Sequence, residues 1–439
     1  MAAPARLTDW TSLSEHGRQA ALPQSRRRLA SLGRTLRAVV RDFPATPSIE
    51  GPLSGLPYVV KDMIGTGIAP ASWGCAEPVE AALDVSPVVA RLDAAGACLI
   101  GAAEMTELAY EPSGINPARG GALNPWNRDA VPGGSSSGSA ALVASGCCFV
   151  ALGSDTGGSV RIPAHCCGIT ALKPTFGRFP LNGAMPLAPS LDTIGIMARS
   201  AADVALVDRV LTGAPRGAES PVVFNAMEDA FAASDPEVAM ICRAALDVFH
   251  RHGMKVGGRS GFPDEADRHV LTVMQAEAAL THRVRMDDPR VDATLRRRLG
   301  KGLTIAVEHR QAAIEARSRL RDEFVSRFLE KGAIAVLPVM PVRTPWRSDV
   351  DPQSSAFSAR TLYALSRFTR FVNYFGLPAV AIPVGFDRRG LPVALQLIGR
   401  PDDDQLLLDL AQQFQAVTDW HARVPAAVAP LIANEGVAA

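Results

Sequence analysis

The chain has 439 residues, of which 47% are hydrophobic, and its formal net charge is +1. This composition is typical of a globular chain that can bury a sizeable core. The balanced charge gives no electrostatic case for binding nucleic acid or an anionic membrane surface, and an aromatic content of 6% does not suggest a base-stacking surface.

Residues 1–50 are expected to form an N-terminal helical segment that packs on the core. Apolar residues recur at near-helical spacing from Leu29 to Val40, and the three arginines at 26–28 are interpreted as a solvated helix face. The N-terminal stretch has no apolar signal-peptide region, and no run approaches the roughly 18 apolar residues of a membrane span. We therefore expect a cytoplasmic protein that does not enter a membrane.

Residues 51–214 alternate between short apolar runs and helical patterns. The run "GLPYVVKD" at 55–62 is strand-like, and residues 86–105 and 139–158 each predict a helix, a glycine turn and a strand. A further strand and helix follow at 193–215, with Ser200 as the N-cap and Gly213 as the C-terminal stop. This alternation predicts βαβ units whose buried strands are mainly parallel.

The rest of the chain begins with a variable region at 215–330, which is richer in charge and helical pattern and is expected to line one side of a substrate cleft. Strand-like segments then return over 331–415, at 333–342, 378–386 and 392–400, and a final helix is expected within 402–420. Early and late segments should therefore share one sheet. We expect residues 51–430 to form a single domain, with no internal repeat.

The seven cysteines show neither a C-x-x-C pair nor a cysteine–histidine metal spacing. Two pairs are adjacent in sequence, and adjacent cysteines rarely bridge each other. We interpret all seven as buried, reduced thiols. No metal and no cofactor are expected.

Two glycine–serine loops lie close together, in "VPGGSSSGSAALVASG" from Val131 and "LGSDTGGSVRIPAHCCGITALKPT" from Leu152. Neither contains a phosphate-binding glycine motif. The second lacks the G-x-S-x-G elbow, because Arg161 stands two residues after Ser159. His165 is the only histidine nearby, and a core histidine is the favoured interpretation over a general base. The two loops are expected to face each other across one site.

Lys61 is the candidate base, one of only five lysines. It follows the apolar run "LPYVV", and burial would lower its pKa and free a neutral amine to accept a serine proton. The alternative is that Lys61 pairs with Asp62 or another carboxylate at the strand end.

The combination of Lys61-Asp62, "GGSSSGSAA" at 133–141, "DTGGSVRIPA" at 155–164 and "GITALKPTFGR" at 168–178 resembles the amidase signature family. The resemblance covers about 51–214 and 330–415. It implies an α/β fold with a central mixed, twisted β-sheet covered by helices on both faces. It also implies a Ser-cisSer-Lys triad.

In that triad Ser159 is the nucleophile, Ser135 is the bridging serine, with a cis peptide bond to Gly134, and Lys61 is the base. Ser159 would form an acyl-enzyme that water resolves. Backbone N–H groups of the turn Thr156-Gly157-Gly158-Ser159 would form the oxyanion hole.

Further residues are expected to support this triad. Ser136 is expected to hydrogen-bond near Ser159 or Lys61, Asp155 and Arg161 to brace the nucleophile loop, and Lys173 to be structural. Met63 stands where the family often has a polar residue.

The sequence thus predicts an amidase that cleaves a small carboxamide or linear amide and releases ammonia or an amine. An A-type amidotransferase subunit that supplies ammonia to a partner, and a non-catalytic binding protein on the same fold, are the alternatives. Tyr110 and Arg119 are candidate substrate contacts, and an arginine in the pocket would suit a carboxylate-bearing substrate. A homodimer is the default expectation.

Overall fold

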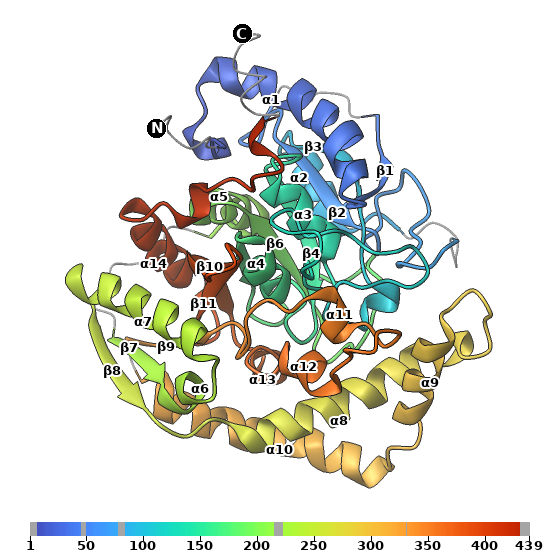
Figure 1. The fold of residues 1–439 in the computed structure, drawn as a ribbon, viewed down its shortest axis with the longest axis vertical. Helices are drawn as coiled ribbons and strands as arrows, with labels where there is room; N and C mark the ends of the chain where they lie inside the picture. Colours follow the sequence, from blue (N-terminus) through green and yellow to red (C-terminus); the bar gives the residue numbers. More distant parts are fainter. Residues whose placement is uncertain (1–6, 45–49, 78–83, 215–222, 331, 431–439) are drawn as a thin grey trace.

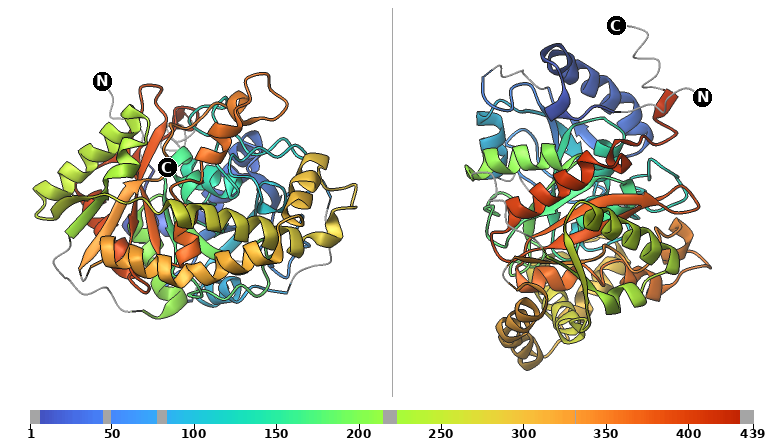
Figure 2. Two further views of the ribbon diagram at one scale, coloured as in Figure 1. Left: turned by 90° about the horizontal axis from the view of Figure 1, so that it is seen from below. Right: turned by 90° about the vertical axis from the view of Figure 1, so that its left-hand side faces the viewer.

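The computed structural model describes residues 7–44, 50–77, 84–214, 223–330 and 332–430. Its centre is an 11-stranded sheet, which crosses the molecule in Figure 1 from the blue strands to β8 and is drawn from two further sides in Figure 2. The strands are β1 Val39–Asp42, β2 Pro57–Lys61, β3 Cys98–Ala103, β4 Val150–Asp155, β5 Thr170–Lys173, β6 Thr193–Ala198, β7 Val223–Met227, β8 Lys255–Arg259, β9 Ala333–Pro338, β10 Ala379–Phe386 and β11 Pro392–Ile398.

The strand order is β1-β3-β2-β4-β6-β5-β10-β11-β9-β7-β8, so early and late segments share one sheet as expected. Within the described residues, six of the ten strand pairings are antiparallel and four are parallel. The expectation of mainly parallel strands from the helix–strand alternation is therefore wrong. Antiparallel pairing through β5, β6, β10 and β11 makes the sheet mixed, as the family resemblance implies.

Helices cover both faces of this sheet. Along β2, Tyr58 and Val60 pack in one apolar cluster and Val59 in another, because successive side chains of a strand point to opposite faces. Helices α5 and α14 pack on the first face, and α3 and α4 on the second. Because the central strands are covered on both faces, their sequences are continuous apolar runs.

The α-helices have the following bounds: α1 Glu15–Arg28, α2 Pro87–Ala94, α3 Ser137–Ala144, α4 Arg161–Cys167, α5 Ala201–Thr212, α6 Glu228–Ala232, α7 Pro236–Arg251, α8 Asp264–Thr281, α9 Ala293–Gly302, α10 Val307–Phe328, α11 Arg347–Val350, α12 Ala359–Ala364, α13 Arg370–Phe375 and α14 Asp404–Ala416. The expected caps of α5 are present: Ser200 Oγ accepts from Asp203 N–H at 3.2 Å, and Gly213 has a φ of 69°. Helices α8 and α10 run together across the bottom of Figure 1.

Two segments depart from the sequence expectation. The helical pattern of the N-terminal segment ends earlier than predicted, and β1 (Val39–Asp42) pairs antiparallel with β3 at the sheet edge. The charged region 215–330 also contributes strands β7 and β8, which pair in parallel. Its first residues, 215–222, lie outside the described chain, as do residues 45–49 of the N-terminal segment.

The parallel pairing of β2 with β4 positions the candidate site. Val60 pairs with Leu152, so the carboxyl ends of the two strands lie at the same edge of the sheet. Lys61 ends β2, and Ser154 and Asp155 end β4. Lys61 and Ser154, which are far apart in sequence, therefore lie at the same edge of the sheet.

All seven cysteines are buried and none forms a disulfide, as expected. No helix in the described part of the chain combines the length and hydropathy needed to cross a bilayer. No cluster of three or more His, Cys, Asp or Glu side chains suited to a metal ion occurs among the described residues.

Candidate active site

Lys61 lies fully buried at the end of β2. Its Nζ donates to Ser135 Oγ at 2.6 Å and to Ser154 Oγ at 2.8 Å. Burial lowers the pKa of Lys61 from 10.5 to about 7, although the carboxylates of Asp155 and Asp192 oppose this shift. The neutral amine of Lys61 is therefore populated near pH 7. It contacts the Ser135 hydroxyl and can accept a proton from it.

Ser135 lies in the first glycine–serine loop, just before α3. Its peptide bond to Gly134 is cis, as the resemblance implies. The next residue, Ser136, donates its backbone N–H to the carbonyl oxygen of Ser159 at 3.2 Å. The two glycine–serine loops are therefore in direct contact, as the sequence predicts.

Ser159 stands between β4 and α4 and is half-buried, whereas Thr156, Gly157 and Gly158 are buried. No hydrogen bond of its hydroxyl is present within the described residues, so the direct link in the predicted triad is the one between Lys61 and Ser135. A partly exposed serine at the end of a buried turn is accessible to a substrate.

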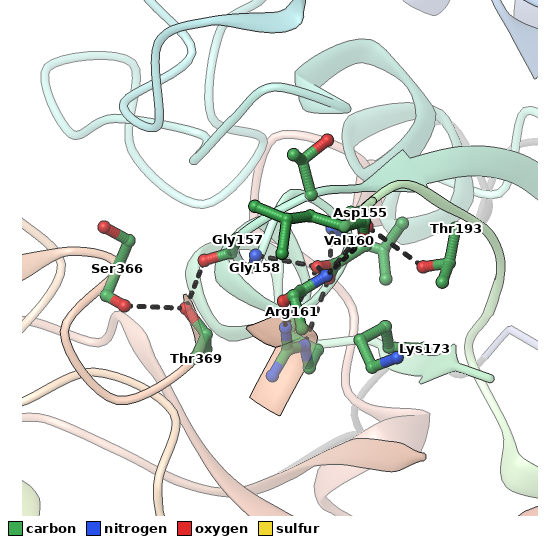
Figure 3. A network of polar contacts seen from close by, with 12 residues as sticks. Asp155, Gly157, Gly158, Val160, Arg161, Lys173, Thr193, Ser366 and Thr369 are labelled. Atoms are coloured by element: carbon green, nitrogen blue, oxygen red, sulfur yellow. Dashed lines mark hydrogen bonds and ion pairs between the residues drawn. The ribbon is translucent and has the colours of Figure 1, made fainter. Parts of the chain in front are cut away.

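Asp155 anchors the turn that carries Ser159 (Figure 3). Its carboxylate accepts from Gly158 N–H at 2.7 Å, from Val160 N–H at 3.2 Å and from Arg161 Nε at 3.1 Å. Asn373 Nδ2 donates to it at 2.9 Å. Burial alone would raise the pKa of Asp155, but the guanidinium of Arg161, together with Lys173 and Asn373, outweighs burial and holds that pKa well below its usual range.

These contacts alter the expected set of oxyanion-hole donors. The N–H of Gly158 points to Asp155, so Gly158 is not an available donor, contrary to the sequence interpretation. In the part of the chain that the structure describes, the N–H groups of Thr156, Gly157 and Ser159 have no acceptor. These three groups are the remaining candidates for donors to an oxyanion.

The conformation of the turn requires glycine at position 158. Gly158 has a φ of +126°, which side chains rarely adopt, and a Cβ there would lie 2.2 Å from Thr369 Oγ1. Thr369 Oγ1 donates to the carbonyl oxygen of Gly157 at 2.7 Å (Figure 3). The segment before α13 therefore packs directly on the turn and fixes its shape.

Ser154 is a contact of Lys61 that the sequence interpretation missed. Its hydroxyl accepts from Lys61 and donates to Met63 Sδ at 3.2 Å. Ser136 Oγ lies 3.3 Å from the carbonyl oxygen of Ser154 and 3.4 Å from its nitrogen. The sequence did offer a signal for this contact, because Ser154 is a polar residue within the otherwise apolar run of β4.

The two candidate substrate contacts have different surroundings. Arg119 pairs with Glu104 at 3.1 Å, lies 3.8 Å from Asp62, and donates to Ser72 Oγ at 2.6 Å. Carboxylates of the protein therefore already pair with this guanidinium, and the role of Arg119 as a substrate contact stays a prediction. Tyr110 is half-buried, and the guanidinium of Arg298 covers its ring.

His165 is a core residue, as the sequence interpretation favoured. It is fully buried, and its Nδ1 accepts from the Ala394 N–H at 3.2 Å. Burial lowers its pKa to about 3, so it stays neutral. It packs among core residues and touches neither Lys61 nor the two serines.

A family model described as amidase matches residues 37–251 and 272–408. The chain belongs to the amidase family. An amidase of known crystal structure is 28% identical, with a TM-score of 0.81, and the match covers 91% of this chain and 96% of that one. The family assignment makes the protein an enzyme that acts on carbon–nitrogen bonds.

Subunits of an amidotransferase are also similar to this amidase-family chain. The A subunit of glutamyl-tRNA(Gln) amidotransferase from Roseiflexus sp. (strain RS-1) is 34% identical, over 90% of this chain and 89% of its own length. The crystal structure of the same subunit from Thermotoga maritima has a TM-score of 0.79 and 27% identity, covering 94% of this chain and 95% of that one.

Proposed function

We propose that this amidase-family enzyme hydrolyses a small carboxamide or linear amide through an acyl-enzyme on Ser159. The observation that carries the proposal is the 2.6 Å contact between Lys61 Nζ and Ser135 Oγ, made by a buried lysine whose pKa is lowered to about 7. A base that is neutral near the working pH is suited to proton transfer.

In the proposed first step, Ser159 Oγ attacks the carbonyl carbon. Its proton passes to Ser135 Oγ as the Ser135 proton passes to Lys61 Nζ. The carbonyl oxygen becomes an oxyanion held by the free N–H groups of the turn, each of which contributes on the order of 3 kcal/mol.

When the carbon–nitrogen bond breaks, the proton returns from Lys61 through Ser135 to the leaving nitrogen, which departs as ammonia or an amine. Water then attacks the ester and gives its proton to the same relay, which returns that proton to Ser159 Oγ as the acid leaves.

The test is ammonia release by the purified chain over a panel of small aliphatic and aromatic amides, with Ser159→Ala and Lys61→Met measured beside it. Turnover that disappears in both variants is the expected result. Turnover that persists in Ser159→Ala would refute the acyl-enzyme on this residue. Wild-type protein that neither turns over an amide nor reacts with a fluorophosphonate probe would favour a non-catalytic binding protein.

A second candidate is an ammonia-supplying amidotransferase subunit. It is favoured by 34% identity to the Roseiflexus subunit over 89% of that subunit's length. Such a subunit would share the same acyl-enzyme chemistry, and its activity would depend on a partner. Ammonia release from glutamine that appears only after partner subunits are added would favour this candidate, whereas release by the chain alone favours the amidase.

A further inference from the structure

A cavity of about 240 Å³ lies beside the loop that carries Ser135. Glu111 forms part of its wall, and a Cβ on Gly134 would lie 2.8 Å from the carbonyl oxygen of Glu111. The N–H of Gly134 donates to the carbonyl oxygen of Pro112 at 2.7 Å. The cavity wall is therefore in contact with Gly134, the residue that precedes Ser135 of the proposed proton relay.

The four carboxylates that line this cavity each accept a backbone N–H group: Glu107 accepts from Asp292 at 3.1 Å and Asp351 from Gln353 at 2.9 Å. Glu111 accepts from the Ser113 N–H at 3.1 Å and from Ser113 Oγ at 2.6 Å. Asp292 caps α9 by accepting from the Thr294 N–H at 2.8 Å and the Leu295 N–H at 3.1 Å. These oxygens are therefore used in holding the walls together.

Two arginines reach the cavity, and their surroundings differ. Arg347 donates Nη1 to the carbonyl oxygen of Ala122 and Nη2 to that of Gly120, each at 3.2 Å. Arg298, on α9, forms no hydrogen bond and no ion pair with any residue that the structure describes, although its charge acts on a carboxyl of the same cavity: burial raises the pKa of Glu111, and Arg298 opposes this shift. Its guanidinium carbon lies 5.0 Å from the ring centroid of Tyr110. Stacking on the Tyr110 ring holds the Arg298 guanidinium in place and leaves its N–H groups available to a ligand.

We propose that Arg298 binds a carboxylate of the substrate, so that the scissile amide belongs to a short acid amide. The inference rests on the proposed amide hydrolysis. A planar guanidinium can bind a carboxylate through two parallel hydrogen bonds. Leu295 and Leu362 supply apolar wall for the connecting methylene groups. The cavity is smaller than the roughly 300–1,000 Å³ of a typical drug-sized site, which suits a short chain.

The kinetic test compares three amides that differ in their terminal group: succinamate, which is anionic; butanamide, which is neutral; and 4-aminobutanamide, which is cationic. We expect Arg298→Gln to raise KM for succinamate by about 10–100-fold, the effect of losing a hydrogen-bonded charge. KM for butanamide should stay within about threefold. The matched control is Arg297→Gln on the same helix, whose side chain is exposed and bonds Thr294 Oγ1, and it should change neither value.

A binding test separates this inference from the proposed hydrolysis. Malonamate, succinamate and glutaramate are titrated calorimetrically into Ser159→Ala and into Ser159→Ala/Arg298→Gln. We expect the second variant to bind its best ligand about 10–100-fold more weakly. If Arg298-dependent binding is seen but the wild type releases no ammonia, the carboxylate site stands and the hydrolysis fails.

Three results would overturn the carboxylate site. One is equal binding of butanamide and the best acid amide. Another is acid-amide binding that is absent or indifferent to Arg298→Gln. The third is preferential binding of 4-aminobutanamide, which would assign the cavity to a cation held by Glu111.

Discussion

Two buried lysines at strand ends differ in what they can do. Lys61 ends β2 and Lys173 ends β5, both are fully buried, and burial lowers the pKa of each to about 7. Lys61 contacts two serine hydroxyls, whereas Lys173 donates to the carbonyl oxygen of Pro174 at 2.6 Å. A hydroxyl can give up a proton and a carbonyl cannot. A lowered lysine pKa therefore marks a base only where the partner has a proton to lose.

The largest expected effect tests this difference directly. Lys61→Met should lower kcat/KM by about 10²–10⁴-fold, the usual contribution of general acid–base catalysis, whereas Lys173→Met should stay within about tenfold. Ammonia release from the best amide measures both, with circular dichroism to show that each variant is folded. Equal losses in two folded variants would mean that the serine contacts do not distinguish the lysines.

The pH dependence of kcat/KM should be set by Lys61 and not by Lys173. Because Lys61 must be neutral to accept a proton, kcat/KM should fall about tenfold per pH unit below pH 7 and level off above it. Lys173→Met should keep the same profile. A profile that loses its acid limb in that variant would transfer the base role to Lys173.

A smaller effect is expected at Ser154, which orients Lys61 without accepting the substrate's proton. Ser154→Ala removes the 2.8 Å contact and should lower kcat by about 2–10-fold, the value of one net hydrogen bond, with KM unchanged. Ser154→Thr should restore most of the rate because it keeps the hydroxyl. Failure of Ser154→Thr to recover activity, with KM raised in both variants, would indicate a packing role.

The smallest effect concerns folding stability. In the unfolded chain Lys173 has a pKa near 10.5, so above pH 7 the unfolded state binds one more proton there than the folded state. Stability from this group rises with pH by about 1.4 kcal/mol per unit. Urea unfolding of wild type and Lys173→Met between pH 7 and 8 should show that difference in slope. Identical slopes would mean that Lys173 is charged in the folded protein.

The sequence predicted the parts of the site that depend on local patterns. The apolar run before Lys61, the glycine–serine loops and the α5 caps are each encoded within about ten residues. Strand direction depends on which strands pair across long stretches of chain, and helix–strand alternation did not reveal it. The role of Gly158 was mispredicted for another reason: Asp155 lies only three residues away, but the bond of its carboxylate to the Gly158 N–H depends on the conformation of the turn.

The sequence interpretation missed Ser154 and Arg298 for different reasons. Ser154 faces Lys61 because β2 and β4 pair in parallel, a relation that no local pattern specifies. Arg298 is one of three consecutive arginines on α9, and only the tertiary structure distinguishes it, by placing Tyr110 beneath it.

The contacts of Asp155 and Arg161 also constrain the order in which the enzyme becomes active during synthesis. Arg161 donates to Asn373 Oδ1 at 2.6 Å and to Gln396 Oε1 at 2.7 Å, more than 200 residues further along the chain. A nascent chain that has emerged only as far as residue 330 already contains Lys61, Ser135 and Ser159 but lacks both amides. Pairing over such separations forms late in folding. The turn that carries Ser159, the proposed nucleophile, therefore depends on the last strands of the sheet, and we expect incomplete chains to lack the proposed activity.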